Sequence, residues 1–447
     1  MPRRNLIWAL AILAAAGGLL LLMPNSPRWD PSGTADFDPV ADAYAKIRQE
    51  YLLEVDPDEL RRQAIASMVD QLDEYSTYLP PEKAQTFSDR IKGRARGLGL
   101  KVEIVNGRVA ILGAVEGSPA VNLPLRRGDR LLEVDGLDIS GMELKRIENL
   151  LDTGASKEVA ITVMHEDGKW EVVRASRGEI SVKSVQALWR TQTGAWAHLI
   201  DPANGIGYIR IKEILPDTPS DVRVVLRRLD RPRGLVLDLR DNPGGSLPEA
   251  ADICDMFLHS GVIASIISRG RIETLRANEL ETYPEEMPVV VLVNGNTASA
   301  AELVAGSLGR HRRAALVGSP TRGKHCIQRM IRLAEGLGQI NLTTSRFVLH
   351  PLKGTALLET SQSPIEPHLV VPLDEAAAAS LRRLEIQSEA IAFAQASPST
   401  TDASSAAELS LADFLQLDAQ LNAAVNLLRR PADMAKTLRA PDLDEKE

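Results

Sequence analysis

Apolar and polar positions follow different patterns along the chain. Apolar residues recur with helical spacing over residues 40–50 and 57–72, which predicts two helices. Asp56 is the expected N-cap of the second helix, and Pro57 suits its first position because no backbone N–H is needed there. These features predict a helical cap over residues 38–92.

Between residues 97 and 180 the pattern changes to short β-branched runs separated by glycines. It predicts strands at 109–111, 131–134 and 159–164 and one helix at 143–151. Short strands with a single helix indicate a β-rich unit, which we assign to residues 95–182.

From residue 205 onward, short apolar runs alternate with amphipathic stretches, the pattern of an α/β unit. The predicted strands are 206–211, 235–239 and 289–293, and the predicted helices are 220–229 and 247–258. Residues 289–293 are apolar at every position, so this strand should be buried on both faces. We assign this larger unit to residues 183–373.

Residues 374–447 are expected to contain helices and a linker. An alanine-rich helix is predicted from 374 to about 394, and an amphipathic helix over 411–428. Between them, residues 396–406 are rich in Ser, Thr, Ala and Pro, which is typical of a linker.

The chain starts with an apolar run. Arg3 and Arg4 precede the uncharged residues 6–23, which at helical rise reach roughly 27 Å, close to the ~30 Å hydrocarbon core of a bilayer. A cleaved signal usually has a shorter apolar stretch, so we expect a signal anchor at residues 1–30, with a cleaved signal as the alternative. The arginine pair should stay cytoplasmic, which would leave the bulk of the chain extracytoplasmic, in the periplasm or outside the cell.

Composition narrows the classes of function. The 447 residues are too many for one compact domain, and a net charge of -8 without a Lys and Arg cluster makes nucleic acid an unlikely partner. The two cysteines, Cys254 and Cys326, can build neither a disulfide framework nor a thiolate zinc site, and we expect no metal and no other cofactor. H-E-x-x-H and G-x-S-x-G motifs are absent, which disfavours zinc peptidases and α/β-hydrolases.

Ser299 is the first candidate for chemistry. The predicted strand 289–293 runs into a loop that ends at Ser299, and a helical pattern follows through residue 308. Free N–H groups and the positive end of the helix dipole would favour a developing oxyanion beside this serine. Taken alone, Ser299 fits a simple N-cap better, since this is a common role for serine.

Two further motifs accompany this serine. Residues 238–245 read D-L-R-D-N-P-G-G, Ser299 lies in T-A-S-A-A-E, and T-R-G-K at 321–324 is followed by Gln328. Together these motifs resemble the carboxyl-terminal processing peptidases, the tail-specific proteases with a serine–lysine dyad. The resemblance extends from about residue 40 to residue 371.

The resemblance implies a role for each matched residue. It makes Ser299 the nucleophile, Lys324 the general base and Gln328 the residue that orients the base. The backbone N–H groups of Gly245 and Ala300 become the oxyanion-hole donors. A lysine base needs a buried pocket, because its pKa must fall from near 10.4 to about 7.5–8, at about 1.36 kcal/mol per unit.

The β-rich unit resembles a PDZ domain. The resemblance rests on Gly97-Leu98-Gly99-Leu100, on G-S-P-A at 117–120, and on R-G-D at 127–129 leading to Asp135-Gly136. A glycine-rich loop beside an exposed strand edge can offer N–H groups to the carboxylate of a peptide C-terminus. The expected peptide-binding residues are therefore Gly97, Leu98, Gly99 and Leu100. The expected ligands are protein or peptide substrates with apolar C-termini.

Some positions depart from the family's usual pattern. His325 follows the lysine where glycine is usual, and Ala301 stands where a second serine is usual. Residues 71–76 read Q-L-D-E-Y-S where L-D-P-H-S is common, a difference that bears on packing. His325 could alter the burial or the backbone of Lys324.

Residues 324–333 look extended, which bears on Cys326. Side chains two apart on a strand share a face, so Lys324, Cys326 and Gln328 should point the same way. In a straight strand the Cα atoms of Lys324 and Gln328 would stand about 13 Å apart, so their side chains would meet over the thiol. Cys326 is then either an inert buried residue or one whose small size matters to the dyad.

The expected fold is an α/β catalytic core of crotonase-like or ClpP-like ββα architecture with an inserted PDZ domain, an N-terminal helical cap and C-terminal helices. The expected function is that of a membrane-anchored serine endopeptidase that captures substrate C-termini and cleaves upstream of them. One alternative is a catalytically silent PDZ scaffold, which the presence of Ser299, Lys324 and Gln328 disfavours. Another is a crotonase-like enzyme acting on acyl thioesters, which the PDZ segment disfavours. Whether the protein forms a homo-oligomer is left open.

Overall fold

Helices form near the start of the chain where the periodicity predicts them. The structure is a computed structural model that describes residues 37–154, 156–191, 194–278, 283–284, 286–334, 336–349, 363–394 and 410–439. The chain divides into two units, Met1–Ser67 and Met68–Glu447. The first unit contains α2 (Asp38–Glu50), which has no buried residue, and most of α3 (Pro57–Asp70).

The expected signal anchor at residues 1–30 lies outside the described residues. Among the helices that the structure describes, none carries an apolar stretch of membrane-spanning length.

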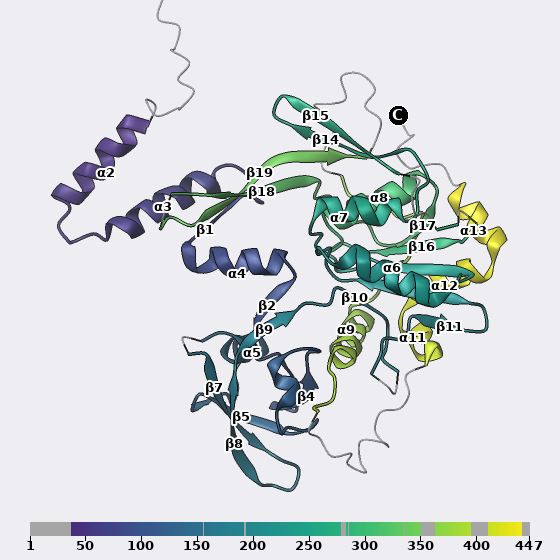
Figure 1. Ribbon diagram of the computed structural model, residues 1–447, viewed down its shortest axis with the longest axis horizontal. Coiled ribbons are helices and arrows are strands. Elements are labelled where there is room, and N and C mark those ends of the chain that lie inside the picture. The colour runs from purple at the N-terminus through teal and green to yellow at the C-terminus, as the bar shows by residue number, and fades with distance from the viewer. Residues whose placement is uncertain are drawn as a thin grey trace, which may run out of the picture. The chain divides into compact units, whose positions relative to one another are not determined.

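The centre of the second unit is a seven-stranded, mostly parallel sheet (Figure 1). Its strands lie in the order β10 (Val185–Gln186), β12 (Ile206–Ile211), β13 (Gly234–Asp238), β16 (Val289–Val293), β17 (Ala314–Gly318) and β20 (Leu369–Val370), and β11 (Leu199–Asp201) also pairs with β12. The strands from β12 to β20 are parallel, whereas β10 and β11 run antiparallel to β12. Every residue of β13, β16 and β17 is buried, which confirms the prediction for residues 289–293.

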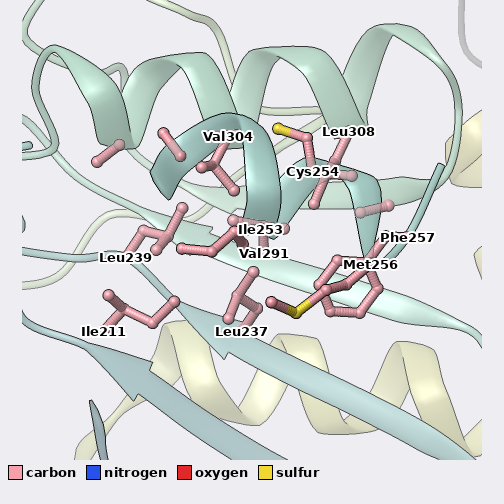
Figure 2. Packing of buried hydrophobic residues seen from close by; sticks show 14 of the residues in the cluster. Ile211, Leu237, Leu239, Ile253, Cys254, Met256, Phe257, Val291, Val304 and Leu308 are labelled. Carbon is pink, nitrogen blue, oxygen red and sulfur yellow. The ribbon is translucent and has the colours of Figure 1, made fainter. Parts of the chain in front are cut away.

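Helices cover both faces of this sheet. One face carries α6 (Thr218–Leu229), α7 (Leu247–Asp255) and α8 (Ala300–Arg310), and the other carries α11 (Leu411–Leu417), α12 (Ala419–Arg429) and α13 (Pro431–Leu438). Along β13, Leu235 and Leu237 belong to the first apolar core and Val236 belongs to the second. Figure 2 shows part of the first core, to which Leu237 of the sheet and Ile253 and Val304 of the covering helices belong.

A second sheet is antiparallel. Its strands are β1 (Thr77–Leu79), β14 (Val262–Ser268), β15 (Arg271–Arg276), β18 (Cys326–Arg332) and β19 (Gln339–Val348), and α4 (Pro81–Ile91) follows β1 in the chain. The register of β18 on β19 shifts between Ile327, which pairs with Ser345, and Gln328, which pairs with Thr343. Thr344 is therefore the extra residue of a bulge on β19.

Residues 94–181 form a smaller β-rich part with its own apolar core. Its six-stranded sheet consists of β3 (Leu100–Val105), β4 (Arg108–Ala114), β5 (Arg130–Val134), β6 (Leu137–Asp138), β7 (Glu158–Met164) and β8 (Trp170–Ser176). Helix α5 (Leu144–Asp152) packs against it, and β2 (Arg94–Gly97) pairs with β9 (Gly178–Ser181). Among the described strands β3 pairs only with β4, so β3 forms an edge of the sheet. The strands and the helix predicted for this part are confirmed.

The alanine-rich helix is shorter than predicted. It forms α9 (Glu375–Glu389), and the chain then becomes extended. Ile391 pairs with Ala114 of β4, and Phe393 is buried in the core of the small sheet. Pairing and burial of this segment end the helix before residue 394.

The predicted helix 411–428 is broken at Asp418. The Asp418 carboxylate accepts a hydrogen bond from the Leu421 N–H and so caps α12 as a separate helix. The buried Arg240 side chain pairs with the same carboxylate and holds it at the break. The predicted linker 396–406 lies outside the described residues.

Candidate functional site

Ser299 lies at the end of the loop between β16 and α8, directly before the helix. Its backbone has φ 55° and ψ −121°, a strained conformation for a residue with a side chain. The Ser299 N–H donates to Glu302 Oε2 at 2.8 Å. The prediction that this serine stands at a helix N-terminus is confirmed.

The turn at Gly244 and Gly245 packs against the Ser299 loop. Both glycines have positive φ, 104° and 138°. A Cβ on Gly244 would lie 2.9 Å from Ser299 Cβ, and one on Gly245 would lie 2.1 Å from the Ile214 oxygen. Only glycine fits these two positions, because the backbone is both close to its neighbours and left-handed.

The N–H groups of Gly245 and Ala300 are available to a ligand. Within the described part of the chain, neither donates a hydrogen bond to another backbone or side-chain group. Ile214 is held to the turn on both sides, since its N–H donates to the Gly244 oxygen and its oxygen accepts from the Ser246 N–H, both at 2.8 Å. This geometry fits the predicted oxyanion donors.

Asn242 joins the glycine turn to the serine loop. It is completely buried, and its amide nitrogen donates to the Ile211 oxygen at 2.8 Å. Its amide oxygen accepts from the Gly244 N–H at 2.8 Å, and its backbone oxygen accepts from the Ala298 N–H at 2.9 Å. Asn242 therefore fixes the turn relative to the residue that precedes Ser299.

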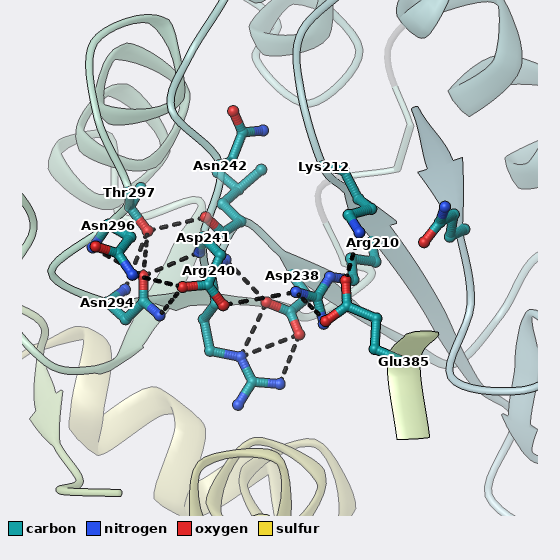
Figure 3. Close-up of polar contacts among 12 residues, drawn as sticks. Arg210, Lys212, Asp238, Arg240, Asp241, Asn242, Asn294, Asn296, Thr297 and Glu385 are labelled. Atoms are coloured by element: carbon teal, nitrogen blue, oxygen red, sulfur yellow. Dashed lines mark hydrogen bonds and ion pairs between the residues drawn. The ribbon is translucent and has the colours of Figure 1, made fainter. Parts of the chain in front are cut away.

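Arg240 holds the strand end that leads into this turn (Figure 3). Its Nη2 lies 2.6 Å from Asp238 Oδ2, and its Nη1 lies 3.0 Å from Asp418 Oδ1. Burial alone would raise the pKa of Asp238, but Arg240 and Arg210 outweigh burial and lower that pKa to about 2. These contacts fix the strand end from which the turn starts.

A buried carboxylate connects the loop that contains Ser299 with the loop that contains Lys324. Glu302 is completely buried, in the first turn of α8. Its Oε2 accepts from the N–H groups of Ser299 and Lys324, both at 2.8 Å. Its Oε1 accepts from the Thr321 hydroxyl at 2.6 Å and from the Gly323 N–H at 2.7 Å. Each carboxylate oxygen thus accepts from two donors, and in the part of the chain that the structure describes no Lys or Arg side chain is among them.

Lys324 lies between Gly323 and the start of β18, and its side chain is partly buried. Its Nζ stands over the Tyr75 ring, 5.0 Å from the centroid. Burial lowers the pKa of Lys324 below its ordinary value. Burial also raises the pKa of Tyr75 to about 12, so that ring stays neutral. The other titratable or charged groups that act on Lys324 are Cys326, Arg322, Glu302 and Asp73.

Gln328 and Cys326 only partly follow the expected strand geometry. Lys324 precedes β18 instead of lying in it, so the expected single strand from Lys324 to Gln328 is wrong, whereas Cys326 and Gln328 both lie in β18. The bulge on β19 faces β18 between Ile327 and Gln328. Gln328 Nε2 donates to Thr343 Oγ1 at 3.2 Å, and no hydrogen bond to Lys324 occurs within the described residues. Cys326 is buried next to Lys324, as expected.

His325, which follows Lys324 in the chain, is partly buried. Its ring lies 5.0 Å from that of Phe347, and its buried Nε2 has no hydrogen-bond partner in the described part of the chain. This atom is 3.8 Å from Glu302 Oε1. Burial lowers the pKa of His325, so the ring is neutral near pH 7. The side chain next to Lys324 therefore contributes to the buried surroundings of Glu302.

The loop Gly97–Leu100 belongs to the small sheet and contributes nothing to the Ser299 site. Leu98 N–H and Gly99 N–H donate to Asp152 Oδ1, at 2.9 and 3.2 Å. Asp152 therefore occupies two of the loop N–H groups, and the assignment of Gly97, Leu98, Gly99 and Leu100 to peptide binding stays a prediction.

Sequence reasoning missed several residues that shape the site. Glu302 could have been found from the sequence, because Glu three residues after a serine N-cap is a capping-box pattern. Asn242 lies in the motif at 238–245, but no role was assigned to it. Tyr75 and Asp152 gave no signal, because each acts across a long stretch of sequence.

Two hollows occur in the surface. One, of about 180 Å³, is lined by residues that include Arg210, Glu385 and the Arg240 side chain described above. The other, of about 850 Å³, is lined by residues that include His259 and Arg312. Neither is lined by Ser299 or Lys324, so hydrogen bonding and burial define the candidate site better than the size of a hollow does.

Known proteins resemble this chain over most of its length. The family model "Peptidase family S41" matches residues 205–371, a stretch that contains both Ser299 and Lys324. A carboxy-terminal-processing protease of Bartonella bacilliformis is 32% identical over 344 residues, which are 75% of this chain and 75% of the relative. The carboxy-terminal processing protease CtpA of Bacillus subtilis is 29% identical over 322 residues, 71% of this chain and 66% of the relative.

A solved structure, that of a photosystem II D1 C-terminal processing protease, is 22% identical. It aligns with 78% of this chain and 98% of its own, at a TM-score of 0.41. A likeness at that score adds nothing to the sequence matches.

Proposed function

This chain belongs to peptidase family S41, and we propose that it is a carboxyl-terminal processing endopeptidase in which Ser299 is the nucleophile and Lys324 the general base. The observation that carries the proposal is the buried Glu302 carboxylate, which accepts hydrogen bonds from the backbones of both residues. A side chain that joins these two loops keeps a serine and a lysine 25 positions apart in the sequence at one site.

The first step is acylation of the serine. Ser299 Oγ attacks the scissile carbonyl carbon and gives its proton to the neutral Lys324 amine. The carbonyl oxygen becomes an oxyanion, which accepts from the N–H groups of Gly245 and Ala300. As the C–N bond breaks, the Lys324 ammonium returns the proton to the leaving amine. An ester on Ser299 remains.

The second step releases the acyl group. Lys324, neutral again, takes a proton from water, and the hydroxide attacks the ester carbon. A second oxyanion forms at the same donors, and the C–O bond to Ser299 breaks as the ammonium returns the proton to Oγ. The products are a carboxylic acid and the free serine, so atoms and protons balance.

The base has to move before it can act. Among the described residues Lys324 Nζ makes no hydrogen bond to Ser299, and it stands over the Tyr75 ring instead. Catalytic hydrogen bonds often form only when substrate is bound. We expect the lysine to leave the ring and reach Ser299 Oγ in the substrate complex.

Paired substitutions test the dyad. With an unfolded protein as substrate, Ser299→Ala and Lys324→Arg should both be inactive, because a guanidinium cannot lose its proton in this pH range. In the wild type, kcat/KM should rise with pH through the lowered pKa of Lys324. An active Lys324→Arg variant with a flat profile from about pH 6 to 10 would sink the assignment of the base.

The small sheet is the proposed substrate-recognition element. Its edge strand β3 begins at Leu100, directly after the glycine-rich loop, and α5 packs beside it. A peptide that pairs with this edge would end at the loop, which is how a PDZ domain binds a C-terminus. We propose protein substrates with apolar C-termini, captured here before cleavage at Ser299.

Membrane attachment is a separate proposal. The uncharged run at residues 6–23 after Arg3 and Arg4 supports a signal anchor with the peptidase outside the cytoplasm. Expression of the full chain and of a version that starts at residue 31, followed by membrane fractionation, tests this. Equal amounts of both in the soluble fraction would contradict it.

A further inference from the structure

The glycine-rich loop of the small sheet already holds a carboxylate. Asp152, the last residue of α5, accepts from the N–H groups of Leu98 and Gly99 at a single oxygen, Oδ1. Among the described residues these two N–H groups are the only hydrogen-bond partners of the Asp152 carboxylate, and it forms no ion pair with Lys or Arg. A hydrogen bond from a backbone N–H to a carboxylate is of the stronger, charge-assisted kind.

The loop is shaped around this carboxylate. A Cβ on Gly97 would lie 2.3 Å from Asp152 Oδ1, so the missing side chain leaves the space that the oxygen fills. The N–H groups of Leu98 and Gly99 both point to this oxygen, and Gly99 has φ 72°, a left-handed conformation that favours glycine. The loop carbonyls are bound elsewhere: the Leu98 oxygen accepts from Ala120 N–H at 3.0 Å and the Gly99 oxygen from Val115 N–H at 2.8 Å. These carbonyl hydrogen bonds hold the loop in place, so that the N–H groups of Leu98 and Gly99 keep fixed positions.

A peptide on the sheet edge would meet this charge directly. A strand added along β3 ends at Leu100, next to the N–H groups that Asp152 occupies. A terminal carboxylate would compete with Asp152 for those donors and would be repelled by its charge. A peptide without a terminal charge can still pair with the backbone of β3 and does not meet this repulsion.

We infer that Asp152 is a specificity-determining residue that occupies the carboxylate site of the loop and weakens binding of free C-termini. This inference rests on the proposed recognition role of the small sheet. In the wild type, the sheet then selects chains by strand pairing and by the apolar side chain, and the terminal charge contributes little. Removal of Asp152 opens the loop to the terminal carboxylate.

Peptide binding measures the effect directly. The full chain carrying Ser299→Ala, which cannot cleave, is titrated against a labelled ten-residue peptide with an apolar last residue, as free acid and as amide, by fluorescence anisotropy. Asp152→Ala should bind the free acid at least about 10-fold more tightly than the parent does and the amide equally well. Asp152→Asn keeps the size and one acceptor oxygen and should fall between the two. Glu148→Gln, which removes a charge from an exposed position one turn earlier on α5, should match the parent.

Two outcomes would contradict the inference, and they differ in whether the recognition role of the small sheet fails as well. If the parent prefers the free acid over the amide by 10-fold or more and Asp152→Ala adds nothing, the inference is wrong and the recognition role stands. If neither protein binds either peptide, the recognition role fails and the inference fails with it. Thermal unfolding identifies a misfolded variant, and if Asp152→Ala misfolds, Asp152→Asn decides by the same criteria.

Discussion

Two carboxylates of the core are completely buried, Asp238 at the end of β13 and Glu302 at the start of α8, yet they are stabilised in opposite ways. Asp238 is paired with the guanidinium of Arg240 and accepts from the Tyr208 hydroxyl. The donors to Glu302 are three backbone N–H groups and the Thr321 hydroxyl, and it has no Lys or Arg partner among the described residues.

The difference separates an architectural role from an aligning one. An ion pair with a planar guanidinium joins two side chains and fixes the strand end whatever the neighbouring loops do. A carboxylate held by backbone N–H groups instead sets the positions of the segments that carry them. Burial by itself therefore does not identify a functional carboxylate, whereas the identity of its donors does.

The largest expected effect is on stability, at Asp238. Asp238→Asn removes one charge from a buried pair and leaves Arg240 short of a partner, which should lower the free energy of unfolding by about 3 kcal/mol or more. Urea unfolding measures this loss. Asp241→Asn is the matched control, since that carboxylate is exposed and its loss should cost less than about 1 kcal/mol. Equal losses of unfolding free energy in Asp238→Asn and Asp241→Asn would mean that the buried ion pair contributes no more to stability than the exposed carboxylate does.

The next effect is on turnover, at Glu302. Glu302→Gln replaces one acceptor oxygen by an NH2 group that faces N–H donors, so the loops of Ser299 and Lys324 should separate. We expect kcat to fall about 100-fold, equivalent to about 2.7 kcal/mol, with the variant still folded by circular dichroism. Thr321→Val, which removes a single donor, should lower kcat less. Unchanged turnover in Glu302→Gln would mean that the carboxylate supports only the fold.

The pH dependence of stability tests the charge of Asp238. The pKa of Asp238 is lowered from 3.8 to about 2 in the folded chain, so its contribution to stability is present above pH 3.8 and is lost as the pH falls through 2. The shift corresponds to about 2 kcal/mol. The gap in unfolding free energy between wild type and Asp238→Asn should therefore narrow by about that amount between pH 5 and pH 2. A gap that stays constant over this range would indicate that charge is not what Asp238 contributes.

The smallest expected effect is on turnover, at Cys326. Substitution of this residue tests the loop that contains Lys324 and leaves both carboxylates unchanged. Cys326 is 3% exposed beside Lys324, so the larger side chain of Cys326→Leu should displace the loop that Glu302 holds. We expect kcat to fall about 10-fold, whereas Cys326→Ser should stay within about 2-fold of wild type. A wild-type rate for Cys326→Leu would show that the loop tolerates displacement.

Local pattern was enough to predict the central strands and helices. Residues 289–293 are apolar at every position, and a strand buried on both faces is the arrangement that satisfies such a run. Ser299 could be assigned to a helix start for a similar reason, because the loop and the helical pattern adjoin in the sequence. Both features depend on neighbours within a few residues.

Contacts across the fold were beyond local pattern. A short run of basic residues such as 310–313 is usually a solvated surface, but Arg313 is buried and donates to the backbone oxygens of Phe257 and Met287 at 2.9 and 2.8 Å. The single helix predicted at 411–428 is broken because Arg240, from a distant strand end, holds Asp418. Asp152 in the glycine-rich loop is a third case. In each, a polar side chain is placed by a partner that periodicity cannot reveal.

The burial of Phe393 has a consequence for biosynthesis. This side chain, 4% exposed, completes an apolar core whose other buried members lie between Leu98 and Ala175. The ribosome releases the strands of the small sheet long before it releases Phe393. Until Phe393 has been translated, the apolar core of the small sheet is therefore incomplete. Ile391, which pairs with Ala114, emerges just ahead of Phe393. The small sheet thus matures late although it is made early, and a chaperone bound to it during translation would shield the apolar surface that Phe393 finally covers.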